Sequence, residues 1–410
     1  VRIAQLLDGK VDLIHASAGN HEVRDAFVVT HPSLFMPDGV NSYLAAEVKK
    51  HVQTPVATVG AFTEPALMEE IIRTGKADVI DVARGLISDP DLPVKARTGN
   101  EKDITRCLRC FTCFSYIITN QQLCCAVNPE IGCEYETKFV TPAAKPKKVL
   151  VAGGGIAGMQ AALTALDRGH EVVLAEKTNR LGGTLRCEEK VPFKDHLDDY
   201  LNLQEKRVNE ANIDLRLNTE VTPEFVAEIG PDAVIAALGA RPIKPPIPGI
   251  DGANVISAED AYVYPEKTGD KLVILGAGFV GTELGIYLRG LGKEVTIIEM
   301  LPGLNDAGNV LHGLAVDVRL REVGIPVHYK TKAVDISEKG VTGEAEDGAQ
   351  TLYEADSVIY AVGQAPLWDE AEALNATAPE FYQIGDCVAP KNVREATKSA
   401  FFIANNLGRV

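Results

Sequence analysis

Hydrophobic and polar positions over residues 1–105 form a pattern that predicts helices and strands in alternation. An amphipathic opening helix leads into the apolar strand VDLIHA (11–16), which is followed by a loop through Pro37. A helix (41–52), a strand (55–60), a helix that ends at Gly75 and a strand (77–85) complete the pattern. Short apolar strands separated by helices are typical of a parallel sheet. These three β/α units match either the last part of a (β/α)8 barrel, which needs eight, or a small three-stranded domain.

The second half of the chain contains an internal repeat. Residues 147–177 and 270–300 both read as strand, glycine turn, helix, strand and acidic residue. Each copy is followed later by a related strand end, IAALGARP (235–242) and IYAVGQAP (359–366). This plan is that of a dinucleotide-binding βαβ unit. The sequence therefore predicts two Rossmann-like folds in tandem, after a connector rich in Pro, Lys and Ala (138–148).

Five of the eight cysteines are clustered in the segment from Cys107 to Cys125. Cys107, Cys110 and Cys113 have C-x2-C-x2-C spacing, and Cys125 follows after a short arm. Three thiolates at this spacing with a distant fourth are typical of an iron–sulfur cluster. Structural zinc, which more often uses two separate Cys or His pairs, is the main alternative, and scattered reduced core thiols are another. Cys124 competes with Cys125 as the fourth ligand.

The first repeat favours FAD. Gly153, Gly155 and Gly158 form G-x-G-x-x-G after an apolar strand, and Glu176 follows where a carboxylate accepts hydrogen bonds from a ribose. An RLGG segment ending at Gly183 comes shortly afterwards. Near the C-terminus, Asp386 in QIGDC lies between a strand and a helix, where an acid reaches the ribityl chain of a flavin; a helix N-cap is the alternative role. The list of candidate FAD residues is Gly153, Gly155, Gly158, Glu176, Gly183 and Asp386.

The second repeat favours NADH. Gly276, Gly278 and Gly281 form the same glycine turn, with Glu299 in the equivalent acidic position. A carboxylate there repels the 2′-phosphate of NADPH, and no cation follows it in Met300-Leu301-Pro302. NADPH is therefore the less favoured cofactor. In both repeats the alternative is that the glycines serve only the turns.

Charge and composition narrow the class of partner. The 410 residues carry a net charge of −16, which argues against nucleic acid or an anionic membrane. The sequence shows no signal peptide and no apolar run of membrane-spanning length, and its clustered cysteines fit a reducing, cytoplasmic environment. The chain starts without Met and inside a helix, so we expect a fragment or a chain whose front part is missing. A homo-oligomer is left open.

Together these motifs resemble the iron–sulfur flavoenzymes of the old yellow enzyme class, which include 2,4-dienoyl-CoA reductase, 2-enoate reductase and bile-acid-modifying relatives. The resemblance covers nearly the whole chain. It implies an α/β chain with a partial TIM-barrel FMN domain (1–105), an iron–sulfur segment and linker (106–145), an FAD domain in two parts (146–250 and 356–410) and an NAD(P)H domain (251–355).

The resemblance also implies roles for individual residues. The context CAVNP selects Cys125 over Cys124 as the fourth cluster ligand. The segment AGNHE makes His21 the catalytic histidine over the FMN, although a single loop histidine is by itself more often a surface residue. The positions that match the family's FMN phosphate site are Gly60, Ala83, Arg84 and Gly85. For Arg84, a solvated surface charge is the alternative.

The activity implied is reduction of an activated C=C bond in an enoate, a dienoyl-CoA or an enone. Electrons pass from NADH to FAD, to a [4Fe–4S] cluster, to FMN and to the substrate, because two flavins in separate domains need a one-electron carrier between them. The sequence departs from the family at Ala61, where relatives have Arg, in the x2 spacing of the third cysteine, and in the absent first barrel strands. An amine dehydrogenase similar to the trimethylamine enzyme, a diaphorase or electron-transfer fragment and a disulfide reductase are the rival interpretations.

Overall fold

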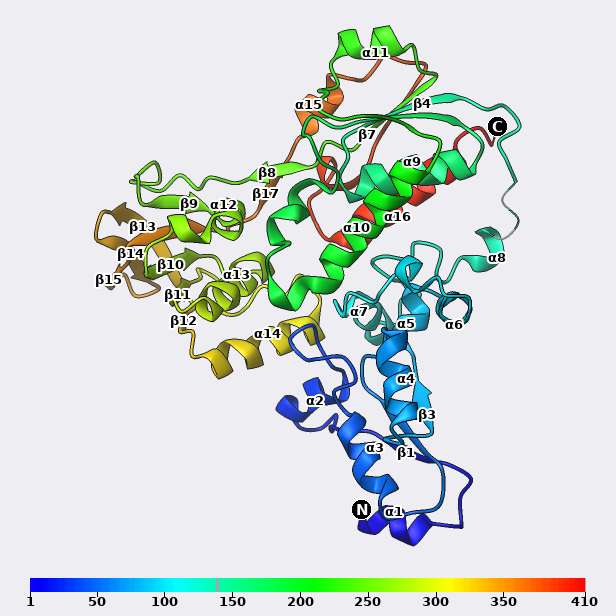
Figure 1. The fold of residues 1–410 in the computed structure, drawn as a ribbon. Helices are drawn as coiled ribbons and strands as arrows, with labels where there is room; N and C mark the ends of the chain where they lie inside the picture. The colour runs from blue at the N-terminus through cyan, green and yellow to red at the C-terminus, as the bar shows by residue number, and fades with distance from the viewer. Residues whose placement is uncertain (138, 140, 410) are drawn as a thin grey trace. The chain divides into compact units, whose positions relative to one another are not determined.

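A computed structural model describes residues 1–137, 139 and 141–409 (Figure 1). The chain divides into two compact units, Val1–Asn128 and Pro129–Val410. Of the connector predicted over 138–148, residues 138 and 140 lie outside the described residues. No helix in the described part of the chain has both the length and the apolar character needed to cross a membrane.

The first unit is built on a three-stranded parallel sheet with the order β1-β2-β3. Ile14 pairs with Val56, and Ala57 pairs with Val79. Apolar residues of the central strand pack against the following helices because a parallel strand is covered on its faces. The elements are α1 (Arg2–Leu7), β1 (Ile14–Ala16), α2 (Arg24–Thr30), α3 (Ser42–Lys49), β2 (Val56–Val59), α4 (Pro65–Arg73), β3 (Val79–Asp81), α5 (Arg84–Ser88), α6 (Leu92–Arg97), η1 (Glu101–Asp103) and α7 (Thr112–Ile118).

The loop predicted between the first strand and Pro37 contains the helix α2. Its N-terminal neighbour Val23 offers no side-chain cap, and the helix is only seven residues long. A short helix without a capping signal is hard to distinguish from a loop in the sequence. The helix forms where Phe27 packs its ring against Phe114, more than 80 positions further along the chain.

The first nucleotide fold has a five-stranded parallel sheet with the order β18-β7-β4-β5-β6. Its last strand, β18, comes from the end of the chain and pairs with β7 through Glu380 and Ala233. The helix α16 packs along α9, as Figure 1 shows. The elements are β4 (Lys148–Ala152), α9 (Ile156–Asp167), β5 (Glu171–Ala175), η2 (Gly183–Glu188), η3 (Pro192–Lys194), α10 (Asp195–Glu210), β6 (Asp214–Arg216), α11 (Pro223–Ile229), β7 (Ala233–Ala236), α15 (Trp368–Glu372), β18 (Glu380–Gln383), η5 (Gly385–Cys387) and α16 (Val393–Asn406), with α8 (Glu134–Thr137) before them.

The second nucleotide fold is inserted into the first. Its parallel sheet has the order β12-β11-β10-β16-β9. A separate antiparallel sheet of β13, β14 and β15 comes before the chain returns to the first nucleotide fold. The two related strand ends of the repeats pair with each other as β8 and β17, where Ala240 meets Pro366. The elements are β8 (Ala240–Pro242), β9 (Val255–Ser257), α12 (Ala258–Val263), η4 (Pro265–Lys267), β10 (Lys271–Leu275), α13 (Phe279–Gly290), β11 (Glu294–Ile298), α14 (Val310–Val323), β12 (Val327–His328), β13 (Thr331–Ser337), β14 (Gly340–Ala345), β15 (Gln350–Glu354), β16 (Ser357–Tyr360) and β17 (Gln364–Pro366).

Candidate functional site

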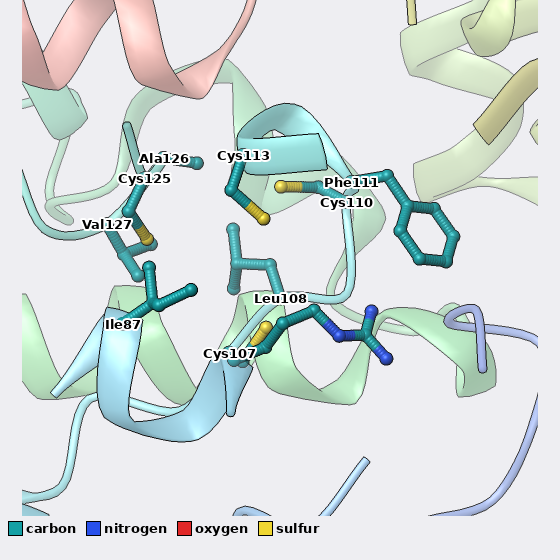
Figure 2. Close-up of a pocket in the computed structure, with 10 residues that line it drawn as sticks. Ile87, Cys107, Leu108, Cys110, Phe111, Cys113, Cys125, Ala126 and Val127 are labelled. Carbon is teal, nitrogen blue, oxygen red and sulfur yellow. The ribbon is translucent and has the colours of Figure 1, made fainter. Parts of the chain in front are cut away.

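Four cysteines line one pocket of the first unit. Figure 2 shows the sulfurs of Cys107, Cys113 and Cys125 turned toward a shared space, with Cys110 beside Cys113. The cavity that these residues line has a volume of about 20 Å³. Cys124 is buried but is not one of the lining residues. The lining consists of Arg84, Ile87, Cys107, Leu108, Cys110, Phe111, Cys113, Cys125, Ala126 and Val127.

The backbone of the cysteine segment turns sharply between the first and third thiols. Arg109 and Phe111 both have left-handed φ angles, 55° and 58°, which non-glycine residues adopt at a cost. Phe111 then begins α7 as its N-cap and is 2% exposed. The N–H of Arg109 donates to the Cys107 sulfur at 3.4 Å. Buried packing of Phe111 offsets the strain, and the turn carries Cys107, Cys110 and Cys113 to the same pocket.

The pocket opposes ionisation of Cys107, Cys113 and Cys125. Burial raises the pKa of Cys107, raises that of Cys113 to about 12, and raises that of Cys125 strongly. The thiols also raise the pKa of one another, while the Arg84 cation lowers the pKa of Cys107 and Cys113. As the side chains stand, no three His, Cys, Asp or Glu residues of the described chain gather closely enough to hold a metal ion. The sulfurs surround a space instead of converging on one point.

The residues predicted to contact FMN follow the carboxyl ends of three adjacent strands. His21 follows β1, Gly60 follows β2, and Ala83, Arg84 and Gly85 follow β3. The order β1-β2-β3 places these positions at one edge of the sheet, the edge where ligands bind in (β/α)8 enzymes. A Cβ on Gly85 would lie 2.8 Å from the Val82 side chain, so this glycine is required by packing.

His21 has a histidine neighbour that the sequence did not single out. Its ring lies 4.9 Å from the Phe27 ring and 5.3 Å from the His31 ring, between centroids. The ring of His31 in turn lies 4.7 Å from that of Phe114. Burial lowers the pKa of His31 to about 4, helped by the charges of Arg84 and His21. No sequence signal identified His31, because its contact with Phe114 joins residues distant in the chain.

The two glycine turns of the second unit have the same construction. A Cβ on the first glycine of either turn would approach a carbonyl oxygen, that of Ala237 at 2.5 Å for Gly153 and that of Ala361 at 2.6 Å for Gly276. A Cβ on the third glycine would lie about as close to the oxygen of the first, 1.8 Å for Gly158 and 2.2 Å for Gly281. Both ends of each turn therefore exclude any side chain.

The second glycine of each turn faces open space. A Cβ on Gly155 would have Gly183 Cα as its nearest neighbour, at 3.9 Å, and a Cβ on Gly278 would have nothing within 4 Å. The protein's own packing does not require glycine at either position. In dinucleotide-binding turns the second glycine lets the backbone approach the pyrophosphate. The space beside Gly155 and Gly278 fits this use.

Each acidic residue holds its glycine turn by two backbone hydrogen bonds. Glu176 accepts from the N–H of Gly154 at 2.7 Å and from that of Thr178 at 2.8 Å. Glu299 accepts from Ala277 at 2.7 Å and from Leu301 at 2.8 Å. Each carboxylate oxygen has a second lone pair for a further donor, such as a ribose hydroxyl. Glu176 and Glu299 each therefore stabilise the glycine turn of their own repeat, and each carboxylate lies beside that turn.

Asp386 lies close to the first glycine turn. Its neighbour Gly385 has a φ of 67°, and a Cβ there would be 3.0 Å from that of Ala157 in the first turn of α9. The Asp386 carboxylate accepts from the N–H of Lys391 at 3.3 Å, and burial raises its pKa. The return of β18 to the first sheet therefore brings this acid beside the turn that carries Gly155.

A buried ionic cluster connects the two nucleotide folds. Lys194 of η3 contacts Glu188 of η2 and Glu283 of α13, each at 2.5 Å. The other oxygen of Glu283 contacts His312 Nε2 of α14 at 2.6 Å. Burial opposes ionisation of Glu283, but Lys194 and His312 hold its pKa at about 2. Sequence reasoning missed these residues; Glu283, two positions after the last glycine of the second turn, was the only one near a motif.

Comparison with known proteins identifies the family. Residues 147–400 match the pyridine nucleotide-disulphide oxidoreductase family, and residues 20–103 match the NADH:flavin oxidoreductase / NADH oxidase family. The chain is 34% identical to an NADH oxidase of Thermoanaerobacter brockii, over 98% of this chain and 63% of that protein. It is 31% identical to a cinnamate reductase of Clostridium sporogenes, over 97% of this chain and 59% of that protein.

A solved structure is similar to nearly the whole chain. The structure of a 2-naphthoyl-CoA reductase with 2-naphthoyl-CoA matches with a TM-score of 0.92 and 29% identity, over 99% of this chain and 62% of that one. The chain belongs to the iron–sulfur flavoenzymes of the old yellow enzyme class. It spans about three fifths of the length of these relatives. The predicted fold class, part of a TIM barrel followed by two Rossmann-like folds, is confirmed.

As a member of this flavoenzyme class, the chain is expected to carry FMN with residues 20–103 and FAD with NAD(P) on residues 147–400. The residues present fit these groups. The open space at Gly155 and Gly278 fits two pyrophosphates. Four half-buried thiols that line one pocket fit an iron–sulfur cluster, whose irons are held by deprotonated cysteines.

Proposed function

We propose that this chain forms the electron-carrying part of an NADH-dependent reductase of activated C=C bonds. The observation that carries the proposal is the pocket of four cysteines in the same unit as the strand-end positions of His21, Gly60 and Arg84. The named relatives that reduce cinnamate and 2-naphthoyl-CoA support this class of substrate. We therefore propose an unsaturated acid, an acyl-CoA ester or an enone as substrate.

Different groups of residues would hold the different cofactors. Cys107, Cys110, Cys113 and Cys125 would hold a [4Fe–4S] cluster, and the two glycine turns would hold FAD and NADH. Glu176 and Glu299 would accept from ribose hydroxyls, and Asp386 from the ribityl chain. Gly60, Ala83, Arg84 and Gly85 would contact the FMN phosphate. When bound, these groups supply hydride transfer, single-electron transfer and reduction of the substrate.

His21 orients and polarises the substrate in this proposal. Its imidazole donates a hydrogen bond to the substrate carbonyl, where negative charge develops as the β-carbon is reduced. Phe27 and His31 pack against its ring and restrict its orientation. The intact glycine turn at Gly276–Gly281 favours this reductase over an amine dehydrogenase, which has no use for NADH. We propose a cytoplasmic enzyme, since free cysteines and an iron–sulfur cluster are typical of a reducing compartment.

Metal analysis of anaerobically purified protein tests the proposal. We expect about four iron and four acid-labile sulfide per chain, the content of a [4Fe–4S] cluster. Replacing Cys125 with Ser should remove most of both. Cys124→Ser and Cys133→Ser are the matched controls and should keep the wild-type content, because neither residue lines the pocket. Zinc without iron in the wild-type protein would refute the cluster and the electron path through it.

A further inference from the structure

Arg84 places a positive charge at the wall of the cysteine pocket. It is the only arginine or lysine among the ten lining residues. Its Nη2 donates to the Pro32 carbonyl at 2.8 Å, and its guanidinium carbon lies 5.0 Å from the centroid of the Phe111 ring. These two contacts hold the guanidinium beside the cysteine segment. The charge sits next to thiols on a wall that is otherwise apolar.

One hydrogen-bond donor of Arg84 has no partner. Its Nη1 is buried and makes no hydrogen bond to any described residue, and Arg84 forms no ion pair with a carboxylate in the described part of the chain. A buried N–H without an acceptor is unfavourable, so a persistent one indicates a partner that the polypeptide does not supply. The pocket that Arg84 lines is where that acceptor would be.

The neighbouring Arg109 shows the contrast. It is 5% exposed and also close to Cys107, but it pairs with Asp38 at 3.3 Å and donates to the carbonyls of Ser33 and Met36. Its Nε is also buried without a hydrogen-bond partner among the described residues, but its charge is paired with Asp38 and it is not one of the pocket-lining residues. Of these two arginines, Arg84 is the one whose charge remains available to a group in the pocket.

We propose that the Arg84 side chain serves the iron–sulfur cluster: Nη1 donates a hydrogen bond to a cluster sulfur, and the guanidinium charge raises the reduction potential of the cluster. This inference rests on the cluster proposed above. Reduction adds one negative charge, which a nearby cation stabilises, and hydrogen bonds to sulfur act in the same direction. The effect is strong because the surroundings are buried. The role expected at the FMN phosphate then falls to the backbone at residues 83–85.

Redox titration of the anaerobic protein, followed by the EPR signal of the reduced cluster, tests the inference. Arg84→Gln should shift the midpoint potential to a more negative value at wild-type iron content. Arg97→Gln, which removes an exposed charge from α6, should leave the potential unchanged. An unchanged potential in Arg84→Gln would overturn the inference, and so would a loss of FMN alone. A wild-type protein without the EPR signal would instead refute the proposed function.

If Arg84→Gln fails to assemble a cluster, a second variant tests the proposed hydrogen bond. Arg84→Lys keeps the charge but loses the planar fork of donors. Proton ENDOR of its reduced cluster should lack the coupling from an exchangeable proton that the wild-type cluster shows in H2O and loses in D2O. The same coupling in Arg84→Lys and wild type would overturn the hydrogen bond.

Discussion

Lys194 and Glu283 form an ion pair of 2.5 Å across the two nucleotide folds, with side chains only 10% and 7% exposed. Lys194 precedes α10 of the first fold, and Glu283 lies on α13 of the second. Glu188 and His312 complete the buried cluster on either side. Buried charges are stable only when each is paired, so this pair fixes the two folds against each other.

Glu283→Gln should destabilise the second unit by about 3–5 kcal/mol, the typical cost of removing one partner of a buried pair. The substitution leaves Lys194 with Glu188 as its only anionic partner among the described residues and replaces the carboxylate next to His312 with a neutral amide. The midpoint of urea unfolding measures the change. Glu346→Gln is the control, because its pair with Lys330 is exposed, and it should leave the midpoint where it is. Equal midpoints for both variants would contradict a structural role for Glu283.

Gly155→Ala and Gly278→Ala should separate the two nucleotide sites without loss of folding. Both glycines have negative φ angles, −68° and −76°, and have room for a methyl group. We expect Gly155→Ala to lose bound FAD, because the methyl occupies the space of the pyrophosphate. Gly278→Ala should keep FAD and weaken NADH binding. Flavin content and NADH titration are the measurements.

Gly158→Ala is the contrasting variant for this pair. Its Cβ would lie 1.8 Å from the Gly153 oxygen, so the expected result is failure to fold, detected by circular dichroism. If Gly155→Ala retained wild-type FAD content, the assignment of the first turn to FAD would be wrong.

His21→Ala should slow alkene reduction by about 10²-fold or more, the usual scale for removing a group that stabilises developing charge. NADH-dependent reduction of an artificial dye should keep its wild-type rate, because that reaction needs only the second unit. His51→Ala, an exposed histidine beyond α3, is the control. An alkene rate unchanged by His21→Ala would remove its catalytic role.

His31 should make the first unit less stable in acid. Its folded pKa of about 4 lies below the ordinary value of 6.5, so between these values the unfolded chain binds a proton that the folded chain does not. Stability therefore falls as pH is lowered from about 6.5 to about 4. His31→Phe, which cannot titrate, should show a smaller loss between pH 7 and pH 5 in urea unfolding. Parallel losses in both proteins would show that His31 does not contribute.

NADH should exceed NADPH in kcat/KM by about tenfold or more, corresponding to ~1.4 kcal/mol. The reason is the carboxylate of Glu299, which repels a 2′-phosphate at the end of the second turn. Glu299→Gln should lower the ratio of kcat/KM for NADH to kcat/KM for NADPH, measured by dye reduction. The substitution also removes one of the two acceptors that hold the turn. Equal efficiencies for the two cofactors in the wild-type enzyme would refute the preference.

Local features of the site were predictable from the sequence. The two glycine turns could be predicted because their geometry depends on a few consecutive residues and on the strand before them. The spacing of Cys107, Cys110 and Cys113 indicated a cluster for the same reason, and the context of Cys125 came from the family resemblance. The helix α2 was missed because it lacks a cap and forms against Phe114, far along the chain.

The sequence by itself determined the order of folds, the two glycine turns and the grouping of Cys107, Cys110 and Cys113, since short-range periodicity and spacing encode them. Only the tertiary structure decided that β18 returns to the first sheet with Asp386, that His31 packs on His21, and that Lys194 meets Glu283. It also decided that the Arg84 side chain lines the cysteine pocket. Most of these contacts join residues distant in the chain, and burial, which no local pattern specifies, makes them favourable.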